Sequence, residues 1–156
     1  MGVEDPHPLV SLGDEVLRLH GRLLAVNSDR GAAEGLTGAQ VLVLTAVINA
    51  RQPPTVPQIG RSLGHARQSV QRIADALTSR GLVASKENPD HKRAPLLIPT
   101  EAGRAAHSRL HDSGEAWIAR VTEGIEPDVI AAAAEILRAL RVRMEADLAA
   151  GRAGRQ

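Results

Sequence analysis

The chain has 156 residues, of which 43% are hydrophobic and 24% charged, so it is long enough for one globular domain or for a small domain with added interaction helices. It contains no Cys, Phe or Tyr and one Trp, which excludes disulfides and cysteine nucleophiles and disfavours modules that stack single-stranded bases on aromatic side chains. The net charge is only +1, but residues 61–93 carry seven basic and three acidic side chains, and the rest of the chain is net acidic.

The N-terminal region is predicted to form one long helix followed by a turn. Residues 1–8 contain two prolines and are expected to fray. From residue 9 the apolar residues recur at alternating steps of three and four, which is the heptad seam of a helix that packs against another helix. The seam consists of Leu9, Leu12, Val16, Leu19, Leu23 and Val26. Residues 28–35 are expected to form the turn, and Thr37 to cap a second, largely buried helix that ends before Pro53.

Residues 55–80 predict a helix-turn-helix. Thr55 is expected to cap a short helix, and Gly64 to supply a turn angle that other residues resist. The next helix, about 66–80, has apolar residues at positions i, i+3, i+4 and i+7. These residues are Val70, Ile73, Ala74 and Leu77. One face of this helix is therefore expected to lie in the core, which leaves the polar face free.

A two-stranded hairpin is predicted to follow. Gly81 suits the left-handed end of a helix, Leu82 and Val83 begin one strand, and residues 96–98 form the other. The charged segment 87–93 (ENPDHKR) forms the tip, and Pro95 and Pro99 fit only edge-strand or strand-end positions. A helix-turn-helix followed by such a hairpin is a winged helix-turn-helix, which places one helix in the major groove of DNA.

The C-terminal region is predicted to form two further helices. Thr100 is expected to cap a helix that continues without a break to Val121, and Pro127 to lie in the first turn of the last helix. A second heptad-like stripe there consists of Ile130, Ala133, Leu137, Leu140, Met144 and Leu148. Because each terminal helix needs a partner, we expect a homodimer held by these helices. The alternative is an intramolecular helix pair without a dimer.

The sequence thus predicts a mainly α fold with a small β-hairpin wing. The winged helix-turn-helix lobe is expected at 36–121, the dimerisation helices at 9–34 and 122–150, and frayed tails at 1–8 and 151–156.

The polar start of the second helix of the helix-turn-helix is where contacts with DNA bases are expected. Arg67 and Gln68 are the first candidates, followed by Gln71, because Arg forms paired hydrogen bonds with guanine and Gln with adenine. Contacts with phosphates are expected from Ser69, Arg72 and Arg61.

The hairpin tip is expected to contact the minor groove, where negative potential attracts inserted cations. Arg93 is the first candidate and Lys92 the second. Asp90 repels phosphate, so we expect it to orient one of these cations through an ion pair.

Most of the chain resembles the MarR family of regulators, and the resemblance is strongest in LGHARQSVQRIADALTSRGLV and NPDHKRAPLLIPTEAGR. It implies a triangular homodimer with interlocked terminal helices and two winged helix-turn-helix lobes on a pseudo-palindromic double-stranded DNA operator. It also implies a repressor that a small, often aromatic effector releases. The wing departs from the family pattern: His91 stands where the family has Asp, Asp90 lies one residue earlier, and Pro99 replaces a Leu.

The effector is unknown from the sequence. We expect it to bind between the lobe and the dimerisation helices, near Leu19, Leu23, Val47 or Trp117. Trp117 also fits a simple packing role at a helix junction.

A zinc-responsive regulator is a second hypothesis. His107 and His111 are four residues apart and share one helix face, a spacing that can place two imidazoles on one zinc ion. Similar zinc-sensing regulators imply further ligands, for which Glu15 and His20 are candidates. Exposed histidines without a metal are the simpler interpretation, and no cofactor is assigned.

Other classes of function have less support. The sequence contains no glycine-rich phosphate loop, no GxSxG motif and no cysteine nucleophile, so no enzymatic activity is expected. It also lacks a membrane-length apolar run and a signal peptide, which predicts a cytoplasmic protein without a membrane partner. A winged helix used only for protein assembly remains an alternative, but it would need neither exposed Arg67 and Gln68 nor a basic wing.

Overall fold

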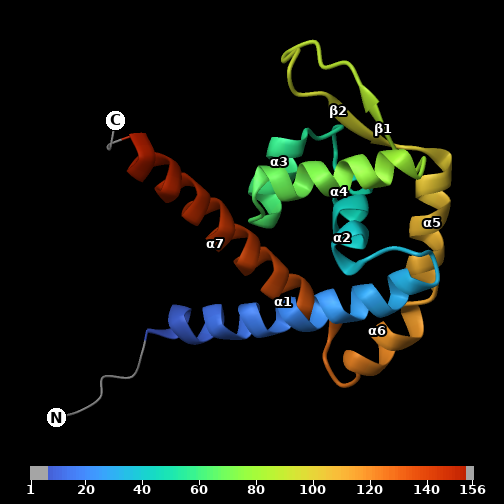
Figure 1. Cartoon of the computed structure of the whole chain (residues 1–156). Helices are drawn as coiled ribbons and strands as arrows, with labels where there is room; N and C mark the ends of the chain where they lie inside the picture. Colours follow the sequence, from blue (N-terminus) through green and yellow to red (C-terminus); the bar gives the residue numbers. More distant parts are fainter. Residues whose placement is uncertain (1–6, 154–156) are drawn as a thin grey trace. The chain divides into compact units, whose positions relative to one another are not determined.

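The computed structural model describes residues 7–153, and it forms two compact units, Met1–Gly114 and Glu115–Gln156. The first unit contains α1 (Pro8–Ala32), α2 (Gly38–Ile48), α3 (Val56–Leu63), α4 (Arg67–Ser79), β1 (Val83–Lys86), β2 (Leu96–Pro99) and α5 (Glu101–Asp112). The second unit contains α6 (Glu115–Val121) and α7 (Pro127–Ala153). The predicted class, mainly helical with one small hairpin wing, is confirmed (Figure 1).

Threonine caps set the starts of α2, α3 and α5. Thr37 and Thr55 each form a capping box with the Gln three residues later, so two backbone donors at each helix start are satisfied. Thr100 accepts a hydrogen bond from the Gly103 amide at 3.0 Å and donates one to the Gly81 carbonyl at 2.6 Å, which ties the start of α5 to the end of the α4 segment. The three predicted threonine caps are thus confirmed.

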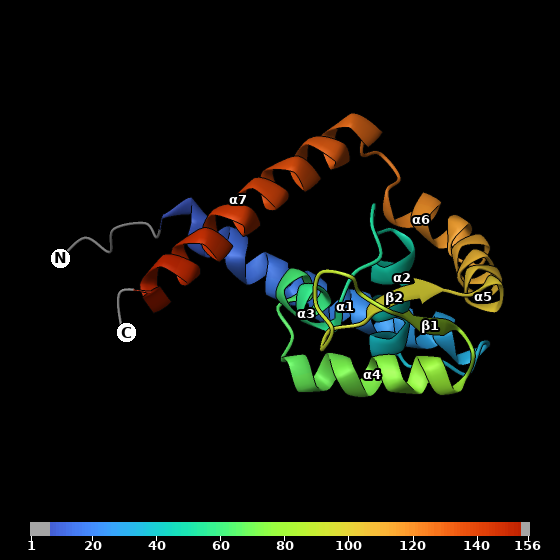
Figure 2. The ribbon, with the colours of Figure 1, turned by 90° about the horizontal axis from the view of Figure 1, so that it is seen from above.

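The core of the first unit is aliphatic and surrounds α2, which lies between α1 and the α3–α4 pair in Figure 1. Leu44, Val70 and Leu77 are completely buried. Figure 2 shows α4 running along the outer side of this unit, so one long face of the helix is left outside the core.

The wing is an antiparallel hairpin in which Val83 pairs with Pro99 and Lys86 with Leu96. The segment before α3 extends this sheet, because the Leu97 amide donates to the Pro54 carbonyl at 2.8 Å and Thr55 forms a bridge with Leu96. The wing is therefore attached to the start of the helix-turn-helix as well as to its end.

Two predicted boundaries are wrong. The segment expected to be a turn at 28–35 is helical through Ala32. Gly31 is buried there, and a Cβ at this position would lie 2.5 Å from the Leu36 carbonyl oxygen. The helix expected to run from Thr100 to Val121 ends at Asp112. The Leu110 carbonyl, which would bind the Gly114 amide in a continuous helix, instead accepts hydrogen bonds from Arg30 and from the Ser113 hydroxyl.

The observed units differ from the predicted division of the chain. The helix α1 belongs to the same unit as the winged helix-turn-helix, and α6 belongs with α7. The assignment of α1 and α7 to dimerisation stays a prediction. The predicted tails lie largely outside the described residues.

Candidate nucleic-acid interface

Helix α4 has one buried face and one exposed polar face. Val70, Ala74 and Leu77 are at most 2% exposed and hold the helix on α2 and α3. The residues predicted to contact DNA all lie on the exposed side: Arg67, Gln68, Ser69, Gln71 and Arg72. The structure therefore presents this polar set to solvent from a helix that is fixed by its other face.

The turn between α3 and α4 controls where α4 begins. Gly64 has a φ of 67°, a left-handed conformation that favours glycine, and it ends α3 as predicted. Ala66 precedes α4 and provides no side-chain cap, so the first amides of α4 are not covered by a side chain. Arg61, at the end of α3, is exposed. Cationic and amide donors thus gather around one helix start.

Most of these side chains are available for a ligand. Within the described part of the chain, Arg61, Arg67, Gln68 and Arg72 form no side-chain hydrogen bond or ion pair. Gln71 differs, because its amide donates to the Asp75 carboxylate at 2.9 Å. Contact between Gln71 and a base would require this hydrogen bond to be exchanged.

A groove of about 310 Å³ lies beside the exposed face of α4. Ser69, Arg72, Ile73 and Ala76 line it from α4, and Thr37 and Gln40 line it from the start of α2. Two residues expected to contact phosphates, Ser69 and Arg72, therefore border this depression.

The tip of the wing is organised by Asn88, which the sequence analysis did not single out. Asn88 is only 7% exposed, and its amide donates to the Ala94 carbonyl at 2.8 Å while its oxygen accepts from the Asp90 amide at 3.1 Å. The sequence Asn-Pro-Asp was a usable signal, because Asn before Pro often starts a turn stabilised by its own side chain.

The expected role of Asp90 is not borne out. In the described residues its carboxylate forms no ion pair with Lys92 or Arg93, and the side chain that closes the loop is that of Asn88. Lys92 and Arg93 are exposed and form no ion pair within residues 7–153, as a role in minor-groove contact requires.

The residues proposed for an effector site are placed as follows. Leu19 and Leu23 are 54% and 40% exposed on α1, whereas Val47 is 3% exposed and belongs to the closed core of the first unit. Trp117 is half-buried in the second unit. The effector site therefore stays a prediction.

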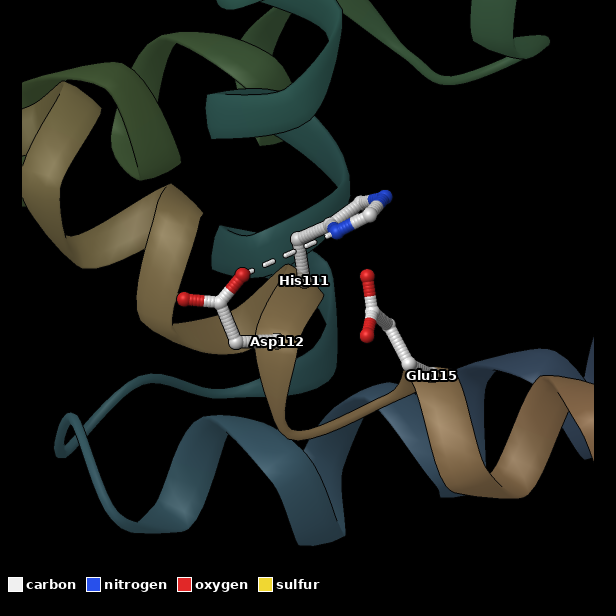
Figure 3. A group of neighbouring side chains, drawn as sticks. All are labelled: His111, Asp112 and Glu115. Atoms are coloured by element: carbon white, nitrogen blue, oxygen red, sulfur yellow. Dashed lines mark ion pairs between the residues drawn. The ribbon is translucent and has the colours of Figure 1, made fainter.

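The zinc hypothesis concerns the end of α5. His107 is partly buried, and burial, together with the charges of His111 and Arg30, lowers its pKa. His111 is exposed, and its Nδ1 lies 3.9 Å from Oδ1 of Asp112. Figure 3 shows these two residues together with Glu115, which is the first residue of the second unit. In the part of the chain that the structure describes, His107 belongs to no cluster of three or more candidate metal ligands.

The remaining proposed zinc ligands lie on α1. The ring of His20 lies 6.4 Å from that of His65 in the helix-turn-helix. Glu15 is 4.0 Å from Arg18. Zinc binding stays a prediction.

None of the described helices is both long enough and apolar enough to span a bilayer.

Comparison with known proteins gives a consistent result. A sequence model of the MarR family matches residues 34–94. An uncharacterized protein of Mycobacterium tuberculosis is 34% identical over 133 residues, which cover 85% of this chain and 92% of the relative. CouR from Rhodococcus jostii RHA1, solved with bound p-coumaroyl-CoA, is 21% identical with a TM-score of 0.71, covering 88% of this chain and 96% of CouR. A mutant MarR from E. coli, solved with operator DNA, is 22% identical with a TM-score of 0.65, covering 85% and 95% of the two chains.

Proposed function

Because the chain belongs to the MarR family of winged-helix transcription regulators, we propose that it binds a pseudo-palindromic operator in double-stranded DNA as a homodimer. It acts in the cytoplasm, by binding rather than by catalysis. The observation that carries this proposal is that Arg67 and Gln68, at the start of α4, are exposed and form no side-chain hydrogen bond or ion pair with the other described residues. An Arg side chain can form two hydrogen bonds with guanine, and a Gln side chain can form two with adenine, so these residues can distinguish base pairs in the major groove.

The terminal helices support the dimer. The seam of α1 is exposed within one chain: Leu9 is 43%, Leu12 37%, Val16 37% and Leu23 40% exposed. On α7, Ile130 is 40% exposed, and Met144 and Leu148 are about 60% exposed. Large apolar side chains exposed at heptad spacing along each helix indicate an interaction surface. A second copy presents the same two surfaces, as a symmetric dimer requires.

The regulator is a repressor that a small molecule releases. CouR was solved with p-coumaroyl-CoA, so this thioester and the free aromatic acid are the first compounds to test here. An effector can weaken operator binding only by as much as it prefers the conformation that binds DNA poorly. The expected result is lower operator affinity at saturating ligand, and unchanged affinity would exclude these compounds as effectors.

Selection of bound fragments from genomic and random DNA tests the function directly. The enriched fragments should share a sequence with two-fold symmetry whose half-site centres lie about one helical turn, ~34 Å, apart. The proposal is wrong if selection returns no common sequence and binding to all fragments is equally weak. That result, with little dependence on salt, would instead favour a winged helix used for protein assembly.

A further inference from the structure

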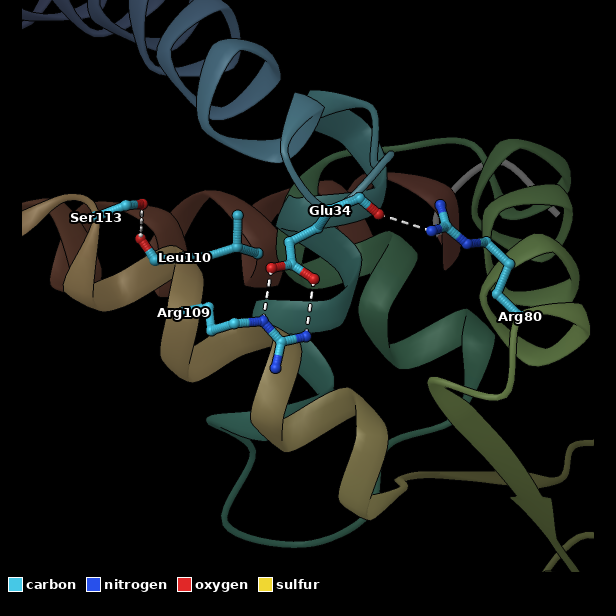
Figure 4. Close-up of polar contacts among 5 residues, drawn as sticks. All are labelled: Glu34, Arg80, Arg109, Leu110 and Ser113. Atoms are coloured by element: carbon cyan, nitrogen blue, oxygen red, sulfur yellow. Dashed lines mark hydrogen bonds and ion pairs between the residues drawn. The ribbon is translucent and has the colours of Figure 1, made fainter.

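Arg80, which follows the last residue of α4, is exposed, and its guanidinium contacts the turn after α1. Its guanidinium donates to the carbonyl of Glu34 at 2.7 Å and to the carbonyl of Gly35, both in the turn after α1 (Figure 4). Gly35 has a φ of 64°, and a Cβ there would lie 3.3 Å from Nη2 of Arg80. Glycine at position 35 thus provides both the turn and the space for the guanidinium.

The side chain of Glu34 is bound from another direction. Nε and Nη2 of Arg109, on α5, donate to the two carboxylate oxygens of Glu34 at 2.7 and 2.9 Å. The Glu34 side chain is 19% exposed, whereas that of Arg109 is 58% exposed. This two-point contact fixes orientation, because the planar guanidinium and carboxylate match in only a few arrangements. Glu34 is therefore bound by α4 through its backbone and by α5 through its side chain.

These contacts connect three elements that matter for the proposed function. The turn at 34–35 follows α1, α4 carries the candidate base contacts, and α5 leads along the chain to α6 and α7. We propose that Arg80 and Arg109 are positioning residues that fix the recognition helix α4 relative to α1 and α5 through the turn at Glu34 and Gly35. We call these four residues the Glu34 clamp. The inference rests on the proposed function, because it assigns the clamp to operator recognition.

The Glu34 clamp differs from two simpler roles of an arginine, which are a stabilising surface ion pair and a contact with a DNA phosphate. An exposed ion pair adds little to stability, so the main consequence of this contact is geometric. Arg80 lies in the basic segment, but its donors bind protein carbonyls, so its loss should not remove a phosphate contact. Operator affinity should therefore fall without a change in salt dependence.

The first experiment compares Arg80→Ala with Arg72→Ala on operator and random DNA over a range of salt. Arg80→Ala should lower the ratio of operator to random affinity roughly 2- to 30-fold, the range for residues that act through a coupling network. Its log–log salt slope should match that of the wild type, whereas Arg72→Ala should reduce the slope by about 2 per dimer. Arg80→Lys should recover part of the ratio, because Lys keeps the charge but lacks the planar fork.

Arg109→Gln and Arg104→Gln form a matched pair. Both residues are exposed on α5 and each change removes one positive charge, but only Arg109 contacts Glu34. Arg109→Gln should lower the affinity ratio and Arg104→Gln should not. In the double variant Glu34→Gln/Arg109→Gln, the loss should be smaller than the sum of the single losses, because both changes break one contact.

Hydrogen exchange without DNA separates this inference from the proposed function. Amides in the last turn of α4 should exchange faster in Arg80→Ala and Arg109→Gln than in wild type or Arg104→Gln. If no operator exists but exchange changes in this way, the clamp holds α4 and the proposed function fails. Unchanged hydrogen exchange in both variants would overturn the clamp. The clamp would also be wrong if Arg80→Ala lost the same affinity for operator and random DNA and had a lower salt slope.

Discussion

Arg67 occupies the first position of α4, and its exposed guanidinium has no partner in the part of the chain that the structure describes. Arg72 borders the groove between α4 and α2. We expect Arg67→Ala to weaken operator binding by ~1–3 kcal/mol and to relax the base preference at one position of each half-site. Arg72→Ala should weaken binding to operator and random DNA alike. Binding measurements on the operator and on each single-base variant check this. An equal effect of Arg67→Ala on all sequences would make Arg67 a phosphate contact.

Glu34 gives a pH-dependent prediction. Its hydrogen bonds with Arg109, and then the charges of Arg109 and Arg80, lower the pKa of this carboxyl below its usual value of 4.5, against the opposing effect of burial. A lowered folded-state pKa contributes stability that is present above about 4.5 and is lost as the pH falls through the folded value. The difference in unfolding free energy between wild type and Glu34→Gln should therefore shrink as the pH is lowered from 6 to about 3. Denaturant titrations at each pH measure it, and a constant difference would contradict the assigned contact.

At the scale of elements, the wing depends on a polar side chain inside its loop. Asn88→Ala removes the donor to the Ala94 carbonyl and the acceptor for the Asp90 amide. Leaving such groups unpaired costs about 1–3 kcal/mol, so the tip should lose its fixed shape. Operator affinity should then fall as far as it does in Arg93→Ala. Ser85→Ala, at an exposed position of β1, is the control and should bind like the wild type. Full affinity in Asn88→Ala would mean that the wing shape is unimportant for binding.

The start of α4 carries the proposed DNA contacts, and its end contacts another part of the protein. Among the described residues, the side-chain donors of Arg67 and Gln68 in the first turn have no partner, while the end is attached through Arg80 to the turn after α1. One helix therefore connects the proposed DNA contacts to the turn that follows α1. In the proposed mechanism, a change in the clamp alters the angle of α4 without touching a side chain proposed to contact DNA.

At the scale of the whole molecule, the dimer prediction can be tested with neighbouring residues of α1. Val16 lies on the apolar seam, whereas Leu17, 72% exposed, lies beside it. Val16→Glu should raise the dimer dissociation constant at least ~10-fold, because burial of such a side chain contributes ~1.5–3 kcal/mol and the carboxylate opposes burial. Leu17→Glu introduces the same charge off the seam and should stay dimeric. Sedimentation equilibrium of both variants measures this, and identical association would place the dimer contact elsewhere.

Several features followed from the sequence because their causes lie within a few residues. Thr37, Thr55 and Thr100 cap helices by binding amides three positions ahead, and Gly64 ends a helix through its own backbone freedom. The apolar spacing of α4 identified its buried face correctly. The same periodicity predicted which polar side chains would be exposed, because the two faces of a helix are complementary.

The tertiary structure decided what depends on residues far apart in the chain. Arg80 and Arg109 contact the turn at Glu34 and Gly35 from 45 or more residues away in the sequence, so no local sequence pattern predicts the clamp. At the break between α5 and α6, the Leu110 carbonyl accepts a hydrogen bond from Arg30, which lies 80 residues earlier in the chain. Val47, proposed for an effector site, lies in the core because α2 is surrounded on several sides. Periodicity and capping act through the neighbouring turn of the chain and so can be predicted from sequence, whereas these contacts exist only after the helices pack.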